Sequence, residues 1–143
     1  MSLYYLIYVS SAVRLMKESD LTELLNQSRE NNSRRNITGM LLYKDGSFMQ
    51  AIEGEEADVR GLLNKISEDS RHQGIITLLQ GALQERQFGK WSMAFANVNS
   101  LSEIERNGHS MYLKEPFTED YFGSDPHKAL KLLISFKRSY HER

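Results

Sequence analysis

The alternation of apolar and polar positions predicts a mixed order of strands and helices along the chain. Aromatic and β-branched runs with a period of two are typical of strands, and apolar residues three and four apart are typical of helices. In chain order, these patterns predict a strand at 3–10, a helix at 20–30, a hairpin at 36–55, a helix at 56–68 and strands at 75–83 and 91–98. This β-α-β-β-α-β-β order predicts the α+β class: a ferredoxin-like βαββαββ sheet with two helices on one face and a groove between them.

Local signals predict the turns and helix ends. Asp45-Gly46 stands between two apolar runs and favours a tight hairpin turn, because glycine adopts a positive φ at no steric cost. Ser19 is the expected N-cap of the first helix. Asn31-Asn32 is its expected end, since asparagine is common where helices stop.

The period of two assigns strand side chains to the two faces of the sheet. The sets expected to share a face are Leu6 with Tyr8, Phe48 with Gln50 and Ile52, and Trp91 with Met93 and Phe95. Gln50 is the polar residue in this pattern that most needs an explanation, because a buried amide requires hydrogen-bond partners. The alternative is a glutamine on a solvent-exposed face, which is the commoner place for this residue.

The character of the chain changes after residue 98. Ser102 and Glu105 have capping-box spacing for a short helix, and residues 108–123 are aromatic but irregular. Asp125-Pro126 opens a helix expected to run to residue 140, with an apolar stripe that needs covering. We therefore expect a first domain at 1–98 and a C-terminal helical extension at 99–143. The extension is expected to pack on the sheet face opposite the groove, to support self-association or a partner surface, and to form no separate effector domain.

Composition narrows the class of protein. The 143 residues are 40% apolar and 26% charged, which is typical of one soluble globular domain with a core. The net charge of −1 gives no general attraction to nucleic acid or to an anionic membrane. The chain has no cysteine, which excludes disulfides, thiolate catalysis and cysteine-ligated metals. With no signal-peptide pattern and no run long enough for a membrane span, we expect a cytoplasmic protein.

Catalytic motifs are missing from the sequence. The four histidines are scattered, no pair has metal-ligand spacing, and no Gly-rich nucleotide loop or Gly-x-Ser-x-Gly motif occurs. An acylphosphatase-like enzyme on this fold would need an anion-binding loop after the first strand, for which residues 10–14 are a poor candidate. An RNA-binding sheet would need exposed aromatic residues on a basic face, which the net charge disfavours.

Several polar residues fall on elements predicted to be buried and converge on the groove between the two helices. They are Tyr8, Ser28, Asn31, Asn32, Gln50, Lys65, Arg71 and His72. A groove with apolar walls and a few placed polar groups suits a flat, hydrogen-bonding ligand. Lys65 and Arg71 are candidates for a phosphate tail. Each residue also has a plainer interpretation: Asn31-Asn32 as a turn, Lys65 as a solvated cation and Tyr8 as part of the core.

Five ordered motifs over about residues 3–98 resemble the BLUF family, blue-light sensors that use flavin. The motifs are Leu-Ile-Tyr8-Val-Ser, Asn31-Asn32 followed by Asn36-Ile-Thr-Gly-Met-Leu-Leu-Tyr, Phe48-Met-Gln50-Ala-Ile-Glu-Gly-Glu, Asp69-Ser-Arg71-His72 and Trp91-Ser-Met93. The length and the helical tail resemble the short, PixD-like members, which have no enzymatic domain of their own. The resemblance therefore implies that the chain is not an enzyme.

The resemblance implies a noncovalent flavin, FAD or FMN, between the two helices. It makes Tyr8 the photochemical electron and proton donor and Gln50 the relay between that phenol and the flavin. It makes Asn32 the residue that holds flavin O4 and N3. The other implied cofactor-binding residues are Ser28, Asn31, Lys65, Arg71 and His72, with Trp91 and Met93 in the switch segment. Lys65 stands where some relatives have arginine, so a phosphate contact there would be a point charge and not a fork.

The resemblance also implies an output. Light would leave Gln50 rotated or tautomerised, giving a red-shifted state that reverts in the dark. This state would be read out by contact with a downstream signalling protein or with another copy of the chain, without a membrane and without direct nucleic-acid binding. The alternatives are a ferredoxin-like flavin- or nucleotide-binding module and an acylphosphatase-like enzyme, neither of them photoactive.

Overall fold

The computed structural model describes residues 3–89, 91–98 and 127–139. Its helices and strands are β1 (Leu3–Ala12), α1 (Glu18–Arg34), β2 (Thr38–Lys44), β3 (Ser47–Glu55), α2 (Glu56–Glu68), β4 (His72–Leu83), β5 (Ala94–Asn97) and α6 (His127–Ser139). This is the predicted order of elements, and α2 has its predicted bounds. The helix expected from Ser102 and Glu105, the irregular stretch at 108–123 and the helix start at Asp125-Pro126 lie outside the described residues.

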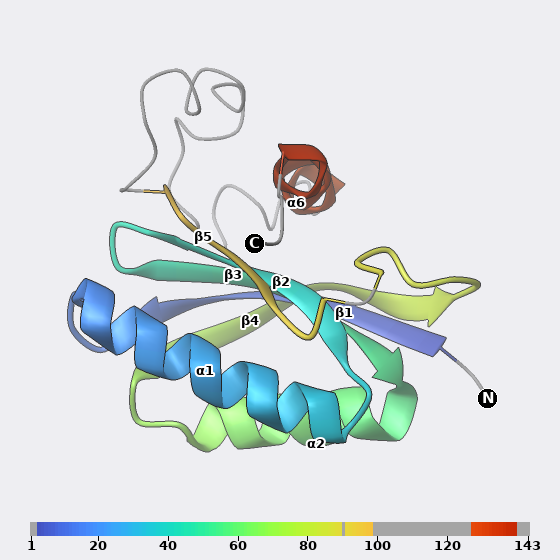
Figure 1. The fold of residues 1–143 in the computed structure, drawn as a ribbon, viewed down its shortest axis with the longest axis horizontal. Coiled ribbons are helices and arrows are strands. Elements are labelled where there is room, and N and C mark those ends of the chain that lie inside the picture. The colour runs from blue at the N-terminus through green and yellow to red at the C-terminus, as the bar shows by residue number, and fades with distance from the viewer. Residues whose placement is uncertain (1–2, 90, 99–126, 140–143) are drawn as a thin grey trace.

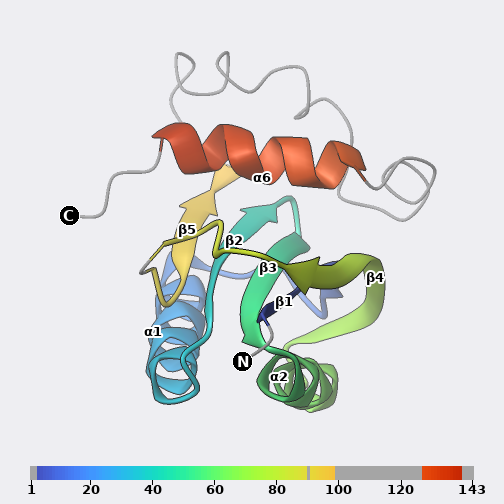
Figure 2. The ribbon, with the colours of Figure 1, turned by 90° about the vertical axis from the view of Figure 1, so that its right-hand side faces the viewer.

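The five strands form one sheet in the order β4-β1-β3-β2-β5. Strand β1 is antiparallel to both β3 and β4, β2 is antiparallel to β3, and β5 runs parallel to β2. Helices α1 and α2 cover one face of the sheet, and α6 lies across the other (Figures 1 and 2). The prediction of a ferredoxin-like α+β fold is confirmed.

The two faces of the sheet build two separate cores. On the α1 and α2 face, Leu6 and Tyr8 of β1 pack with Phe48 and Ile52 of β3. On the opposite face, the core includes alternate residues of β1, β2 and β3 together with Ala129, Leu132, Leu133 and Phe136 of α6. The faces predicted for these β1 and β3 residues are therefore correct, because both sides of the sheet are buried and each strand must alternate between them.

Helix α1 begins two residues before the predicted start. The backbone N–H of Lys17 donates to the Asp20 carboxylate at 3.0 Å, and the Leu21 N–H donates to the Lys17 carbonyl at 3.0 Å. Lys17 is thus the N-cap, and the prediction that Ser19 has this role is wrong. The acid three residues after the cap fixes the helix start, since it satisfies an N–H that no helical carbonyl can reach.

The same helix ends later than predicted. Asn31 and Asn32 lie inside its last turns, and the stop comes at Asn36, whose φ is 55°. The Ile37 N–H donates to the Asn32 carbonyl at 2.9 Å, and the Asn36 N–H donates to the Ser33 carbonyl at 3.4 Å. This pair of bonds is the Schellman arrangement, in which a left-handed residue terminates the helix. Asparagine tolerates that conformation better than most residues.

The hairpin turn forms as predicted. Asp45 and Gly46 have φ values of 50° and 83° and join β2 to β3. Two consecutive residues with positive φ match the right-handed twist of the flanking strands. The turn sets the register in which Leu41 of β2 lies opposite Gln50 of β3.

The last strand is shorter than predicted. Strand β5 begins at Ala94, so residues 91–93 are not part of the ladder and do not alternate. Met93 joins the core under α1 and α2, while Trp91 packs against the core under α6. The prediction that Trp91 and Met93 share a face is therefore wrong. No helix in the described ranges is long and apolar enough to cross a membrane.

Candidate functional site

A pocket opens between α1 and α2, above β1 and β3. It encloses about 720 Å³ of space, its open mouth included. Its lining residues are Tyr8, Leu24, Gln27, Ser28, Asn31, Asn32, Leu41, Phe48, Gln50, Leu62, Lys65, Ile66, Asp69, Arg71 and His72. All eight residues that the sequence assigned to a ligand groove are among them. Sequence reasoning missed Gln27 and Asp69 as members of the site.

Tyr8 and Gln50 form the floor of the pocket. They face each other in register on the neighbouring strands β1 and β3. Both are buried, with exposed fractions of 2% and 4%, and the Tyr8 hydroxyl donates a hydrogen bond to Gln50 Oε1. Burial, and secondarily the nearby Asp69 carboxylate, raise the pKa of the Tyr8 phenol well above its ordinary value of 10.0. Tyr8 therefore stays a neutral proton donor at any physiological pH.

The other end of the Gln50 amide contacts the segment before β5. Gln50 Nε2 donates to the Met93 sulfur at 3.4 Å. A thioether is a weak acceptor, so this bond holds the amide loosely compared with the phenol bond at its oxygen. Gln50 thus joins a strong donor, Tyr8, to a weak acceptor, Met93.

Helix α1 holds the same segment from the other side of the pocket. Asn32 is 1% exposed, and its Nδ2 donates to the Ser92 carbonyl at 2.8 Å. Arg29 Nε donates to the Met93 carbonyl at 3.0 Å. Asn32 is therefore both a pocket-lining residue and a structural bridge from α1 to the chain that enters β5.

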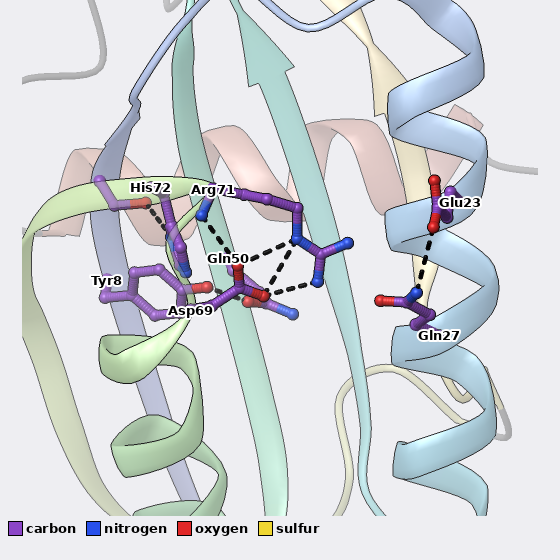
Figure 3. Close-up of polar contacts among 8 residues, drawn as sticks. Tyr8, Glu23, Gln27, Gln50, Asp69, Arg71 and His72 are labelled. Atoms are coloured by element: carbon purple, nitrogen blue, oxygen red, sulfur yellow. Dashed lines mark hydrogen bonds and ion pairs between the residues drawn. The ribbon is translucent and has the colours of Figure 1, made fainter.

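An ion pair between Asp69 and Arg71 closes the end of the pocket after α2. The Asp69 carboxylate accepts from Arg71 Nε at 3.0 Å, from its terminal nitrogen at 2.5 Å and from its backbone N–H at 2.9 Å. These hydrogen bonds lower the pKa of Asp69 and raise that of Arg71. Figure 3 shows the guanidinium pointing across the groove toward α1, where Glu23 and Gln27 lie.

His72 lies beside the floor, at the start of β4. Its Nδ1 is 3.0 Å from the Ser10 hydroxyl, and its ring meets that of Phe48 edge-on with centroids 5.9 Å apart. Burial lowers the pKa of His72 below 6.5. The imidazole is therefore neutral at neutral pH and serves as a hydrogen-bonding wall of the pocket.

The remaining predicted residues lie toward the mouth. Lys65 and Asn31 are exposed, and Ser28 is half-buried. Lys65 places a cation at the rim of the groove. In the part of the chain that the structure describes, no three histidine, aspartate or glutamate side chains gather into a metal site.

These residues fit a flavin. A flavin ring is flat, with an apolar end and an edge of alternating hydrogen-bond donors and acceptors. Apolar side chains from both helices and the sheet wall the pocket, including Leu24, Leu41, Leu62 and Ile66. Amide side chains, which carry both donors and acceptors, stand at its floor and edge. This combination of apolar walls and few polar groups is typical of cofactor sites.

Comparison with known proteins supports the same interpretation. Residues 3–94 match the BLUF family, described as sensors of blue light using FAD. The photoactivated adenylate cyclase subunit beta of Euglena longa is 34% identical over 98 residues, which are 68% of this chain and 11% of that protein. The chain thus spans about a tenth of the length of the photoactivated adenylate cyclase subunits that it matches.

Solved structures also match almost the whole chain. The dark-state structure of BlrB, a BLUF protein, has a TM-score of 0.79 at 30% identity, covering 97% of this chain and 98% of that one. The photo-activated state of BlsA has a TM-score of 0.81 at 24% identity, covering 99% of each chain, and supports the fold.

Proposed function

The chain belongs to the BLUF family of blue-light sensors that use FAD, and on this basis we propose that its light response runs through the hydrogen bond from Tyr8 to Gln50. The observation that carries the proposal is the burial of this pair at the floor of a pocket that fits a flavin. The bond gives a redox-active phenol direct contact with an amide, and the amide lines the pocket beside it.

We propose that eight residues hold the flavin or react with it: Tyr8, Ser28, Asn31, Asn32, Gln50, Lys65, Arg71 and His72. Asn32 and Gln50 would bind the polar edge of the ring, and Lys65 would lie beside the tail as a point charge. The Asp69 carboxylate would keep the Arg71 guanidinium directed across the groove. When bound, the flavin supplies the absorption of blue light and accepts an electron and a proton.

The chain's own part in the reaction is to deliver that proton and then to change a hydrogen bond. Tyr8 keeps its proton at rest because burial raises its pKa. Gln50 lies next to it and can pass a proton along its amide. Turning the amide by half a turn would exchange its oxygen and nitrogen. The turn breaks the weak bond to Met93 and requires the Tyr8 hydroxyl to change from donor to acceptor toward Gln50. The turned or tautomerised amide would present different groups to the pocket, which shifts the absorption to the red.

We propose that the signal leaves through residues 91–97 and is read by protein contact. Met93 touches Gln50, while Trp91 packs on the other core, so the two sheet faces meet in this segment. Residues 1–98 would form the sensor and 99–143 an extension that carries α6. The readout would be a downstream protein or another copy of the chain in the cytoplasm, without catalysis by the sensor itself.

An absorption spectrum tests the proposal. Purified protein with FAD should shift reversibly to the red under blue light, and Tyr8→Phe and Gln50→Leu should remove the shift. Tyr43→Phe is the matched control: Tyr43 is also buried, but its hydroxyl accepts the Met16 N–H at 3.0 Å away from the pocket lining. A shift that persists in Tyr8→Phe would contradict the assigned donor. Failure to bind flavin would contradict the sensor function of this chain.

A further inference from the structure

The β4–β5 connector, residues 84–93, is held by β3 at two places on opposite faces of the sheet. Gln50 contacts its last residue, Met93, on the pocket face. Glu53, three residues further along β3, contacts the connector on the α6 face. A role of the Glu53 contact in signalling rests on the function proposed above.

Glu53 is an unusual residue in its surroundings. It is 1% exposed and lies in register between Tyr5 of β1 and Thr38 of β2. A buried acid is costly unless its oxygens are satisfied. Glu53 Oε2 accepts the backbone N–H of Gln87 at 2.8 Å, and Oε1 accepts that of Phe88 at 2.8 Å. Two consecutive peptide groups of the connector are therefore bound to one carboxyl group.

A third donor completes the site. The Thr38 hydroxyl lies 2.8 Å from Glu53 Oε1 and 2.9 Å from an Arg86 nitrogen. Because the guanidinium can only donate, Thr38 accepts from Arg86 and directs its own proton to Glu53. Arg86 also donates to the carbonyls of Asn36 and Glu53, at 2.8 and 3.3 Å. The first half of the connector is thus tied to β2 and β3 through both its backbone and its arginine.

Hydrogen bonds continue from this anchor to the pocket. The Trp91 N–H donates to the Phe88 carbonyl, and the Trp91 carbonyl accepts from the Gly39 N–H, both at 3.1 Å. The next two carbonyls, of Ser92 and Met93, are held by α1. A bonded path therefore runs from Glu53 through Phe88 and Trp91 to the residue that touches Gln50.

We propose that Glu53 is a positioning residue for the light response, which fixes the first half of the connector so that a change at Gln50 moves Trp91 and Met93. A segment fixed at one end must respond at the other when its contact changes, whereas a loose segment would absorb the change along its own length. Glu53 touches neither the pocket nor the reacting groups. Glu53 instead determines how much of the change at Gln50 reaches Trp91 and Met93.

Glu53→Gln tests this role with little change in size. The carboxamide keeps one acceptor oxygen and replaces the other with an NH₂ donor. In one orientation of the amide this NH₂ group faces the Gln87 N–H, and in the other it faces the Thr38 hydroxyl and the Phe88 N–H. The matched control is Glu56→Gln, the same substitution at an exposed residue that pairs with Arg60 and has no contact with the connector. Arg86→Ala, at a partly exposed position, loosens the same anchor and is the second variant if Glu53→Gln does not fold.

The first measurement is amide hydrogen exchange of the full chain with FAD in the dark. Exchange at Gln87 and Phe88 should be about tenfold faster or more in Glu53→Gln, since one of the two carboxyl oxygens that accept these N–H groups is replaced by a donor. Amides of β1 and all amides of Glu56→Gln should be unchanged. Unaltered exchange at Gln87 and Phe88 would overturn the anchoring role, whether or not the protein responds to light.

The second measurement compares acrylamide quenching of Trp91, the only tryptophan of the chain, in dark and light. The light-dependent change in quenching should fall by at least half in Glu53→Gln and in Arg86→Ala, while the red shift of the flavin persists. A change equal to that of the wild type would overturn the positioning role. A wild-type protein with no red shift would overturn the proposed function itself, and the dark exchange would still decide whether Glu53 anchors the connector.

Discussion

Asn32 of α1 binds the backbone carbonyl of Ser92 through its Nδ2 atom at 2.8 Å, across 60 residues of sequence. The neighbouring Asn31 is exposed and lies at the pocket mouth. Two adjacent asparagines thus have different structural tasks, although the sequence presents them as a pair. This difference can be measured directly.

Asn32→Ala should lower the free energy of unfolding by about 1–3 kcal/mol, because the partly buried Ser92 carbonyl loses its partner and the buried Asn32 side chain leaves a small cavity. Asn31→Ala, the matched control, should change it by less than about 0.5 kcal/mol, as is usual for exposed positions. Urea unfolding of both variants gives the comparison. Equal effects of the two substitutions would show that the bond to Ser92 does not stabilise the fold.

Gly39 is fixed by the close approach of β2 to β3. A Cβ atom added there would lie 2.1 Å from the Ala51 carbonyl oxygen, a contact that only backbone movement can relieve. Gly39→Ala should therefore cost about 3 kcal/mol or more, at the upper end of overpacking effects. It should also disturb the bond from Gly39 to Trp91.

Gly74 provides the contrasting control for this prediction. It has a φ of +65° but nothing within 4 Å of an added Cβ, so only backbone strain opposes Gly74→Ala. The expected cost is about 1–2 kcal/mol. In thermal unfolding, Gly39→Ala should have a clearly lower Tm than Gly74→Ala. The reverse order would contradict the steric argument.

The sequence predicts what depends on local period and misses what depends on contacts across the chain. Alternation places Tyr8 on one face with Leu6, and Gln50 on one face with Phe48 and Ile52, because both sides of the sheet are buried. The adjacency of Tyr8 and Gln50 does not follow from alternation, since it requires that β1 and β3 pair in this register. The family resemblance supplied that relationship where residue patterns alone left the groove as one interpretation among several.

The missed features share a physical cause. Arg71 was predicted as a site residue, but its ion pair with Asp69 was not, because the two lie two residues apart in a turn, where neither the helical nor the strand period applies. Trp91 and Met93 were assigned to one face because the alternation was extended through residues that pair with no strand ladder. Asn36 ends α1 because its backbone adopts a positive φ, which the sequence pattern does not reveal. At the start of the same helix, the hydrogen bond from the Lys17 N–H to Asp20 decides the N-cap, and this bond is known only from the structure.

His72 predicts a dependence of stability on pH. Burial lowers its pKa in the folded protein below 6.5, so the unfolded chain binds a proton more readily there. The free energy of unfolding should therefore fall as the pH drops below 6.5 toward the lowered value. Asp69, whose pKa is lowered from 3.8, contributes a separate loss only in more acidic solution.

His72→Gln should reduce the slope of stability against pH between about 5 and 7, the range set by the histidine pKa. His127→Gln is the matched control, because His127 is exposed on α6, away from the pocket. Urea unfolding midpoints measured at several pH values for both variants give the two slopes to be compared. A slope unchanged by His72→Gln would mean that another group titrates in this range.

Helix α6 should be required to keep the protein from aggregating. Its residues Leu132 and Leu133 have no exposed surface and cover the sheet face that holds Ile7 and Met49. Leu132→Ala should cost about 2–5 kcal/mol, while Lys131→Ala at an exposed position should cost less than about 0.5 kcal/mol. Deleting residues 124–143 would expose the whole apolar face, and light scattering should then detect a larger assembly or loss of solubility. A truncated protein with unchanged size and solubility would mean that α6 does not protect this face, and the core under it would need another cover.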